Sequence, residues 1–241
     1  MRIVAWNCAG ALHRKFEPLL ALKPDIAVVS ECAAPDVLAR KCDLPAFSAP
    51  PIWVGRNRNK GLAVFLFNCA AAHAQGRIDR GLEWLLPIEV TLPRRFNLLA
   101  VWAQNGPWRK AAPGPLRKAL DSYREFLTDE DAVIAGDLNN NAIWDKPGWA
   151  MNHLDAVNIL NGFGLVSAYH AATGETEGAE TAPTHYWRDR RKDGPTYHLD
   201  YIFVPSVWTE REFSFRVEPF EPWTGAGLSD HVPVIFDTGG D

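Results

Sequence analysis

The stretch "VIAGDLNNN", Val133 to Asn141, decides how this sequence is read. An apolar run ends at Gly136 and is followed at once by Asp137, Leu138 and three asparagines. Such a short apolar run is typical of a buried strand. Asp137 and Asn139 are two residues apart at its end, so their side chains point to the same side. A turn does not require two such oxygen donors on one side, and we therefore predict that this strand end holds a ligand.

Polar side chains also stand at the ends of other predicted strands. Asp200 is the hardest to explain structurally, because a lone carboxylate inside the apolar run "YHLDYIFV" costs several kcal/mol unless it is paired or metal-bound. Each of the others has a structural alternative, such as a turn or a cap. Together they predict one shared site at strand ends. They are Asn7 after "IVAW", Glu31 after "IAVVS", and Asp230 with His231 before "VPVIF".

The pattern along the chain mixes helices and strands throughout. Amphipathic segments such as "GPLRKALDSYREFL" (114–127) predict helices, but strands outnumber them by about two to one, which excludes a strictly alternating strand–helix repeat. Two sheets packed face to face, with helices outside, fit this count better. A chain of 241 residues can bury one full core, so residues 1–241 are predicted to form a single domain.

Composition limits the partners and the compartment. The net charge of −4 excludes a globally basic nucleic-acid binder, so phosphates must be bound locally, by a cation cluster or a metal. No apolar run approaches the roughly 18 residues of a membrane helix, and the first residues lack a signal-peptide pattern. We therefore expect a cytoplasmic protein without membrane association. The four cysteines show no CxxC spacing and are expected to be reduced and buried rather than to bind zinc.

The order of these motifs resembles the endonuclease/exonuclease/phosphatase superfamily, which includes exonuclease III-type and DNase I-type nucleases. The resemblance rests on Asn7, Glu31, "GDLN", "LDYIF" and "SDHVPV", which together span residues 2 to 236. It implies a four-layer α/β/β/α sandwich of two mixed sheets flanked by helices (DNase I-like). It also implies hydrolysis of a phosphate ester that depends on Mg²⁺ or Mn²⁺.

The resemblance implies a role for each matched residue. Asn7, Glu31 and Asp230 are similar to metal ligands, with Glu31 the principal one. Asp137 resembles the residue that orients or deprotonates the attacking water, and Asn139 a ligand of a phosphate oxygen. Asp200 is similar to the carboxylate that orients a histidine, His231, which contacts the scissile phosphate. An aspartate at this place would fix the imidazole tautomer and raise its pKa. Asn140 and Asn141 match no family role and are interpreted as a turn.

One position departs from the family pattern. Trp102 stands where the family usually has a tyrosine or histidine that contacts the phosphate. An indole donates one hydrogen bond but accepts no proton. Either Trp102 acts as a donor or packing contact, or Gln104 and Asn105 supply the polar groups, with Asn105 the better catalytic candidate.

Three stretches that pair tryptophan with cations suggest the substrate. They are "WVGRNRNKG" (53–61), "WRK" (108–110) and "YWRDRRK" (186–192), and all three are predicted to be loops. Aromatic rings stack on bases for about 1–3 kcal/mol each, while arginine and lysine follow the backbone. This pattern favours a nuclease acting on DNA, and we separately expect a monomer without a protein partner. The substrate-binding candidates are Trp102, Trp108, Arg109, Tyr186, Trp187 and Arg188.

Two alternatives remain open from the sequence. The first is a phosphatase or phosphodiesterase that acts on a small phosphate ester or a lipid head group. The second is a binding protein that keeps the fold without catalysis. The intact set of acids, amides and histidine argues against the second alternative.

Overall fold

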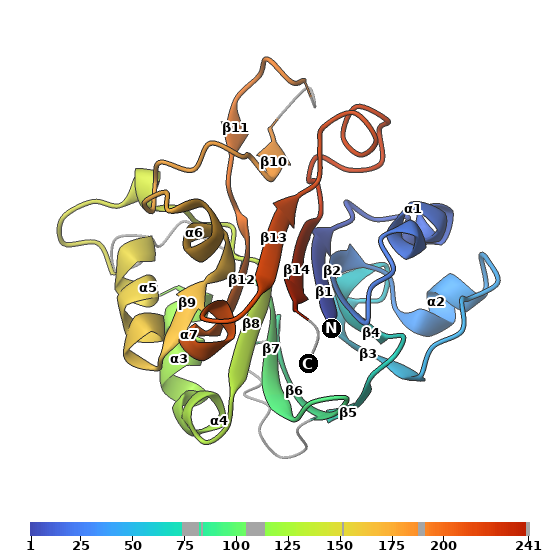
Figure 1. Ribbon diagram of the computed structural model, residues 1–241. Helices are drawn as coiled ribbons and strands as arrows, with labels where there is room; N and C mark the ends of the chain where they lie inside the picture. The colour runs from blue at the N-terminus through green and yellow to red at the C-terminus, as the bar shows by residue number, and fades with distance from the viewer. Residues whose placement is uncertain (74–81, 83, 105–113, 151, 188–190, 240–241) are drawn as a thin grey trace.

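The computed structural model describes residues 1–73, 82, 84–104, 114–150, 152–187 and 191–239. Two six-stranded sheets pack face to face, with helices on the outer faces (Figure 1). The predicted four-layer sandwich of two mixed sheets is therefore confirmed. No helix in these ranges is both long and apolar enough to cross a membrane.

Both sheets are antiparallel except for one parallel pair each. The parallel pairs are β1 with β2 and β7 with β8. The first sheet has the order β13 (Phe213–Val217), β14 (Val234–Thr238), β1 (Arg2–Asn7), β2 (Ile26–Cys32), β4 (Lys60–Leu66), β3 (Ala49–Asn57). The second has the order β5 (Ala70–His73), β6 (Leu85–Leu92), β7 (Phe96–Trp102), β8 (Ala132–Asp137), β12 (Asp200–Pro205), β9 (Leu165–Ser167).

Three buried clusters hold these layers together. The central one lies between the sheets and takes alternate residues of the inner strands, such as Ile3 and Ala5 from β1 and Val133 and Ala135 from β8. The opposite faces of the same strands pack against helices in the two outer clusters. These strands are apolar on both faces because both faces are covered.

Short helices and a hairpin complete the chain. The α-helices are α1 (Phe16–Ala21), α2 (Pro35–Ala39), α3 (Pro115–Ser122), α4 (Arg124–Thr128), α5 (His153–Gly162), α6 (Ala168–Thr173) and α7 (Ser206–Thr209). The 3₁₀ turns are η1 (Leu12–Arg14) and η2 (Ala142–Trp144). β10 (His185–Tyr186) and β11 (Thr196–Tyr197) form a separate two-stranded sheet.

Three local predictions need correction. The stretch 53–61 is not a loop, because Trp53 to Asn57 belong to the edge strand β3, which pairs with β4. Pro87, which suggested an edge or a bulge, lies in an inner strand, β6. It is tolerated there because the described pairing of β6 with β5 stops at Ile88. The helix predicted from 114 to 127 is two helices that meet at Tyr123.

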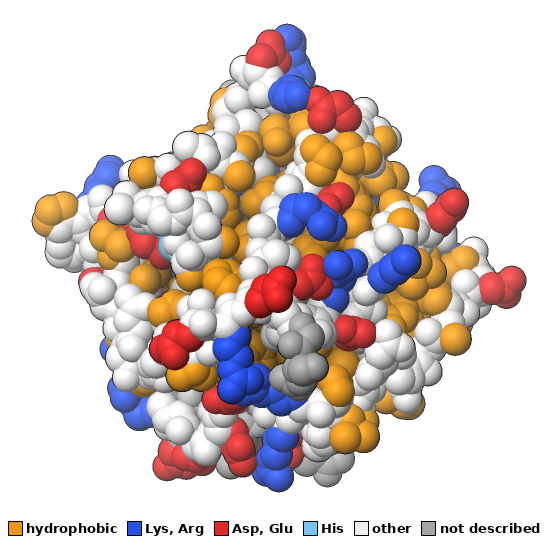
Figure 2. All heavy atoms as spheres, viewed as in Figure 1, with side chains coloured by type: hydrophobic (Ala, Val, Ile, Leu, Met, Phe, Trp, Pro, Cys, Tyr) orange, Lys and Arg blue, Asp and Glu red, His pale blue; other side chains and the backbone are white. Residues whose placement is uncertain are grey.

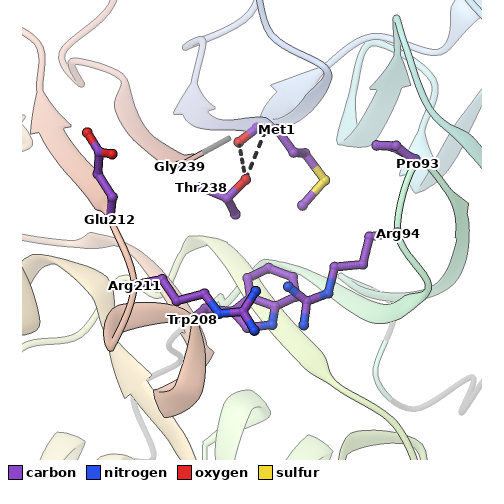
Figure 3. Close-up of a pocket in the computed structure, with 8 residues that line it drawn as sticks. All are labelled: Met1, Pro93, Arg94, Trp208, Arg211, Glu212, Thr238 and Gly239. Carbon is purple, nitrogen blue, oxygen red and sulfur yellow. Dashed lines mark hydrogen bonds between the residues drawn. The ribbon is translucent and has the colours of Figure 1, made fainter. Parts of the chain in front are cut away.

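The topology collects the predicted site residues at one end of the sandwich. β1 and β8 end there, at Asn7 and Asp137, whereas β12 begins there, at Asp200. In Figure 1 this end lies beneath the β10–β11 hairpin, at the top. The opposite end carries a cavity of about 320 Å³ near both termini, lined by Met1, Arg94, Trp208 and Thr238 among others (Figure 3). That cavity is therefore remote from the acidic strand ends.

Candidate active site

The last residues of β8 and the first of β12 form the base of the site. Asp137 and Asp200 stand directly opposite each other in the antiparallel register, and both are buried. Gly136 before them has φ +140°, and a Cβ there would meet the Val101 carbonyl oxygen at 1.9 Å. Only glycine therefore lets β8 approach β7 closely enough to place Asp137. The sequence "AGD" is explained by this contact.

Glu31 reaches the site through a β-bulge. The register of β2 against β4 shifts between Ser30 and Cys32, and Glu31 between them has φ 58°. Asn139 is likewise left-handed, with φ 47°. Such conformations are unfavourable for residues other than glycine and concentrate at functional sites. The bulge turns the Glu31 side chain toward the end of β1.

Asn7 links the two sheets. Its side-chain oxygen accepts a hydrogen bond from the Ala9 N–H (3.0 Å), which fixes the orientation of the amide. The Nδ2 group then donates to Asp137 Oδ2 at 2.9 Å and to Glu31 Oε1 at 3.4 Å. Asn7 therefore joins the predicted metal-side acid to the predicted water-activating acid.

Asn139 completes the environment of Asp137. Its backbone N–H donates to Asp137 Oδ1 at 2.8 Å, and its side-chain Nδ2 donates to Asp137 Oδ2 at 3.0 Å. The same amide donates to the Ala103 carbonyl. Asp137 is thus held by amide donors on both oxygens.

Asp200 and His231 form the predicted pair. His231 Nδ1 lies 2.7 Å from Asp200 Oδ2, and both side chains are buried. The Thr184 hydroxyl donates to the same carboxylate oxygen at 2.7 Å and accepts the Asp200 backbone N–H at 3.0 Å. The ligand atoms of Asp137, Asp200 and His231 lie within 4.8 Å of one another. The acid, the histidine and its orienting carboxylate are therefore one cluster.

The pKa values within this cluster are displaced from their ordinary values. Burial, together with the nearby Asp200 charge, raises the pKa of Asp137 to about 7, although His231 and the Asn7 hydrogen bond oppose the shift. Burial alone would lower the pKa of His231, but the charge and hydrogen bond of Asp200 raise it to about 9. At neutral pH His231 is therefore an imidazolium that can donate a proton, and Asp137 titrates near working pH.

The Ser229 hydroxyl connects Asp230 with Asn7. The Ser229 hydroxyl donates to the Asn7 carbonyl at 2.6 Å, accepts the His231 backbone N–H at 3.1 Å, and lies 3.4 Å from Asp230 Oδ1. The structure thus brings the predicted ligands Asn7, Glu31 and Asp230 to the same strand ends. Their binding of a metal stays a prediction.

The predicted substrate residues divide into three groups. Trp102 is 4% exposed and packs between the sheets against Trp84, so the packing alternative is correct and it does not offer a face to substrate. Tyr186 is also buried, against Phe220, which corrects its assignment to the substrate surface. Trp187 is 45% exposed and keeps the predicted accessibility. Trp108, Arg109 and Arg188 lie outside the described residues, as does Asn105, the catalytic candidate.

Several residues of the site were not singled out in the sequence. Thr184 and Ser229 position Asp200 and His231, and both stand in short polar motifs, "PTH" and "LSDH". His185 lies against the His231 ring with centroids 4.4 Å apart; burial and the His231 charge lower its pKa to about 4, so it stays neutral. Lys60 pairs with Glu31 Oε2 at 3.1 Å while its ammonium lies over the Trp102 ring.

Asn141 is more than the turn residue expected. It caps η2 by accepting the Ile143 N–H, and it is buried. Its Nδ2 group also donates to the Tyr201 hydroxyl, to the His198 carbonyl and to Glu180 Oε2. These contacts join the segment after Asp137 to the start of β12.

Several solved structures share this fold. The structure is similar to a 3′-5′ exonuclease (NExo) from Neisseria meningitidis, with 19% identity, full coverage of both chains and a TM-score of 0.66. An AP endonuclease from Archaeoglobus fulgidus matches with 16% identity, full coverage of both chains and a TM-score of 0.63. A truncated Caenorhabditis elegans TDP2 matches with 16% identity over 98% of this chain and 95% of that one, at a TM-score of 0.63. No family model and no curated protein sequence matches the chain. At these identities the similarity establishes the DNase I-like fold.

Proposed function

We propose that this protein is a divalent-metal-dependent phosphodiesterase that hydrolyses DNA. The observation that carries the proposal is the cluster of Asp137, Asp200 and His231, whose ligand atoms lie within 4.8 Å of one another at the end of both sheets. It combines a carboxyl group that titrates near pH 7 with an imidazolium. A base and an acid with separated pKa values are what hydrolysis of a phosphodiester requires.

Each side chain has a task in this reaction. Asp137 orients the attacking water and accepts its proton, since the amides of Asn7 and Asn139 fix its carboxylate. Asp200 holds Nδ1 of His231, which leaves the Nε2–H to donate to an oxygen of the scissile phosphate. Thr184 keeps Asp200 in the position that this donation needs.

The donor set fits Mg²⁺ or Mn²⁺. Glu31, Asn7 and Asp230 would supply hard oxygen ligands, and one or two carboxylates with waters are enough for Mg²⁺. Glu31 is partly exposed and already pairs with a cation, the Lys60 ammonium. When bound, the ion would polarise a phosphoryl oxygen and shield its developing charge. Asp137 would still orient the attacking water, and the Nε2–H of His231 would still donate to the phosphate oxygen.

The choice of DNA as substrate has two supports. The Neisseria protein is titled a 3′-5′ exonuclease and, bound to a product DNA hairpin, a 3′ phosphatase, and the Archaeoglobus protein is titled an AP endonuclease. In this chain, Trp187 follows the buried β10 and stays exposed near Tyr197, where an aromatic face can stack on a base. Figure 2 shows acidic and basic side chains interspersed on one face, in keeping with local rather than global phosphate binding.

A substrate panel tests the proposal. Purified protein is incubated with Mg²⁺ or Mn²⁺, and in parallel with EDTA, on plasmid, abasic-site duplex, single-stranded DNA, RNA, bis-p-nitrophenyl phosphate and p-nitrophenyl phosphate. We expect metal-dependent cleavage of DNA and of the diester. Asp137→Asn and His231→Gln should each lower the rate by about 10²–10⁴-fold.

Two results would overturn the proposal. Turnover that persists in EDTA would show that the reaction does not depend on a metal. Cleavage of the monoester without the diester would indicate a plain phosphatase. A salt titration separates the remaining alternative, because phosphate contacts release counterions and make DNA cleavage fall steeply with salt. A flat salt response would point to a small phosphate ester instead.

A further inference from the structure

A second cluster of ligand-type side chains lies away from the strand-end site. His170 at the end of α6 faces Glu177 and Glu180 of the following loop, and their ligand atoms lie within 4.8 Å of one another. Each glutamate lies 3.3 Å from one nitrogen of the His170 ring. His153 of α5, whose side chain is 1% exposed, lies behind the cluster with Nε2 3.2 Å from Glu177 Oε2.

Two histidines at this cluster each have a buried ring nitrogen without a hydrogen-bond partner. Among the described residues, His170 Nε2 and His153 Nδ1 are buried and make no hydrogen bond. A buried polar atom of this kind calls for a ligand such as a water or an ion. His170 Nδ1 lies 2.8 Å from the Ser167 hydroxyl, so donation from this nitrogen leaves Nε2 as a lone-pair donor toward Glu180. This is the arrangement of a metal-binding histidine whose other nitrogen is fixed by a hydrogen bond.

The charge of the cluster favours a cation. The Glu180 side chain is buried and accepts hydrogen bonds from the Asn141 amide and from the Gly178 backbone N–H. A cavity of about 570 Å³ borders the cluster. Its described lining includes His170, Glu175 and Glu177 but no lysine or arginine. A cation can therefore reach Glu177 through a cavity whose described lining carries no lysine or arginine.

We infer that His170, Glu177 and Glu180 form a second, structural metal site that takes a transition ion of the Zn²⁺ type. One imidazole with two carboxylates is a zinc-type ligand set, whereas Mg²⁺ and Ca²⁺ prefer oxygen alone. Tetrahedral ligands at zinc lie about 3.4 Å apart, and the ligand atoms here already lie within 4.8 Å of one another. His153 then holds Glu177, and a water from the cavity would complete the four ligands.

A metal ion at this site would fix the loop that carries Glu177 and Glu180, and this loop contacts residues around the strand-end cluster. Glu180 accepts a hydrogen bond from Asn141, which also binds the His198 carbonyl and the Tyr201 hydroxyl next to Asp200. The same loop leads to Thr184, which hydrogen-bonds Asp200. The ion would therefore stabilise the position of Asp200 without contacting substrate.

Metal binding by purified protein tests this inference. The protein is stripped with EDTA, dialysed, and titrated with Zn²⁺ by calorimetry, with Mn²⁺, Ca²⁺ and Mg²⁺ in separate runs. Metal content is then measured after desalting. We expect one Zn²⁺ per chain bound more tightly than the other ions, with a melting temperature that rises with Zn²⁺ concentration. The Glu31→Gln/Asp230→Asn double variant removes the two carboxylates of the proposed strand-end metal site and should keep this Zn²⁺.

Variants of the cluster identify the ligands. His170→Gln and Glu177→Gln should weaken Zn²⁺ binding by at least about 100-fold, and Ser167→Ala, which removes only the partner of Nδ1, by about 10-fold. Circular dichroism shows whether each variant is folded. If the ligand variants are unfolded, the expected 10-fold weakening by Ser167→Ala is the test of the site. Co²⁺ absorption provides a second readout of a nitrogen–oxygen site. The inference is overturned if the stripped wild type binds no Zn²⁺, if His170→Gln binds it unchanged, or if the Glu31→Gln/Asp230→Asn variant loses it.

Discussion

At the scale of single residues, Asp200 determines the protonation state of His231, the proposed catalytic histidine. Asp200→Asn keeps the shape of the side chain but removes the charge that raises the pKa of His231 to about 9. Because burial lowers the pKa of His231 and its two strongest opposing contributions are removed, that pKa should fall from about 9. We expect a rate loss of about 10²–10⁴-fold at pH 8, and an alkaline limb of the pH–rate profile that moves from near pH 9 to lower pH. An unchanged alkaline limb would contradict the proposed role of His231.

Thr184 gives a finer test of the same pair. Thr184→Val removes a hydroxyl that donates to Asp200 and accepts two backbone N–H groups, so it should lower the free energy of unfolding by at least about 2 kcal/mol. As a positioning residue it should also shift the alkaline limb, by less than Asp200→Asn does. Thr184→Ser keeps the hydroxyl and is the matched control. Chemical denaturation and pH–rate profiles of both variants measure the two effects. If the pH–rate profiles of Thr184→Val and Thr184→Ser were equal, Thr184 would contribute to stability but not to the pKa of His231.

At the scale of elements, strand ends are predictable but their irregularities are not. The alternation of apolar runs and polar ends located β1, β2, β8, β12 and β14 because burial imposes that pattern. The bulge at Glu31 left no local signal, since its left-handed conformation is imposed by pairing with β4. The edge strand β3 was missed because its polar residues and half-exposed face resemble a loop. Buried Trp102 was ambiguous because only the opposing sheet decides whether an indole packs or points outward.

The end of β8 makes an element-scale prediction. Gly136→Ala would place a Cβ 1.9 Å from the Val101 carbonyl and force a residue with a side chain into φ +140°. We expect a loss of about 2–4 kcal/mol in the free energy of unfolding, with loss of activity because Asp137 moves. Gly162→Ala is the control, since Gly162 ends α5 and a Cβ there meets nothing within 4 Å. It should be neutral or stabilise by up to about 1 kcal/mol. Similar melting temperatures for the two variants would argue against the strand contact.

At the scale of the whole molecule, the fold could be predicted further than the site. The count of helices and strands favoured two face-to-face sheets, and the motif resemblance supplied the four layers. The register that places Asp137 opposite Asp200 required the structure, because residues 63 positions apart carry no pairing signal of their own in one sequence. The same holds for the His170 cluster, whose members look like ordinary loop polarity until α5 and α6 bring them together.

The displaced pKa values combine into a prediction for the stability of the molecule. His231 has a folded pKa of about 9, above its ordinary 6.5, so it contributes stability that is present below pH 6.5 and lost as pH rises through 9. The raised pKa of Asp137 lowers stability as pH rises from about 4 to 7, while the lowered pKa of His185 has the opposite effect between about 4 and 6.5. These two offset each other, so the alkaline decline should dominate.

Urea unfolding in EDTA at several values of pH between 5 and 9 measures this decline. We expect the free energy of unfolding to fall above pH 6.5 with a slope of up to about 1.4 kcal/mol per pH unit, the limit for one proton. His231→Gln should flatten most of this limb, because it removes the group whose pKa rises on folding from 6.5 to about 9, across that window. Asp200→Asn should flatten it as well, since it removes the charge and hydrogen bond that raise the pKa of the buried imidazole. EDTA is needed because a bound cation would favour deprotonated carboxylates and mask the limb. A wild type whose stability rises between pH 7 and 9 would show that His231 is neutral in the folded protein, and the proton donor proposed for the reaction would be lost with it.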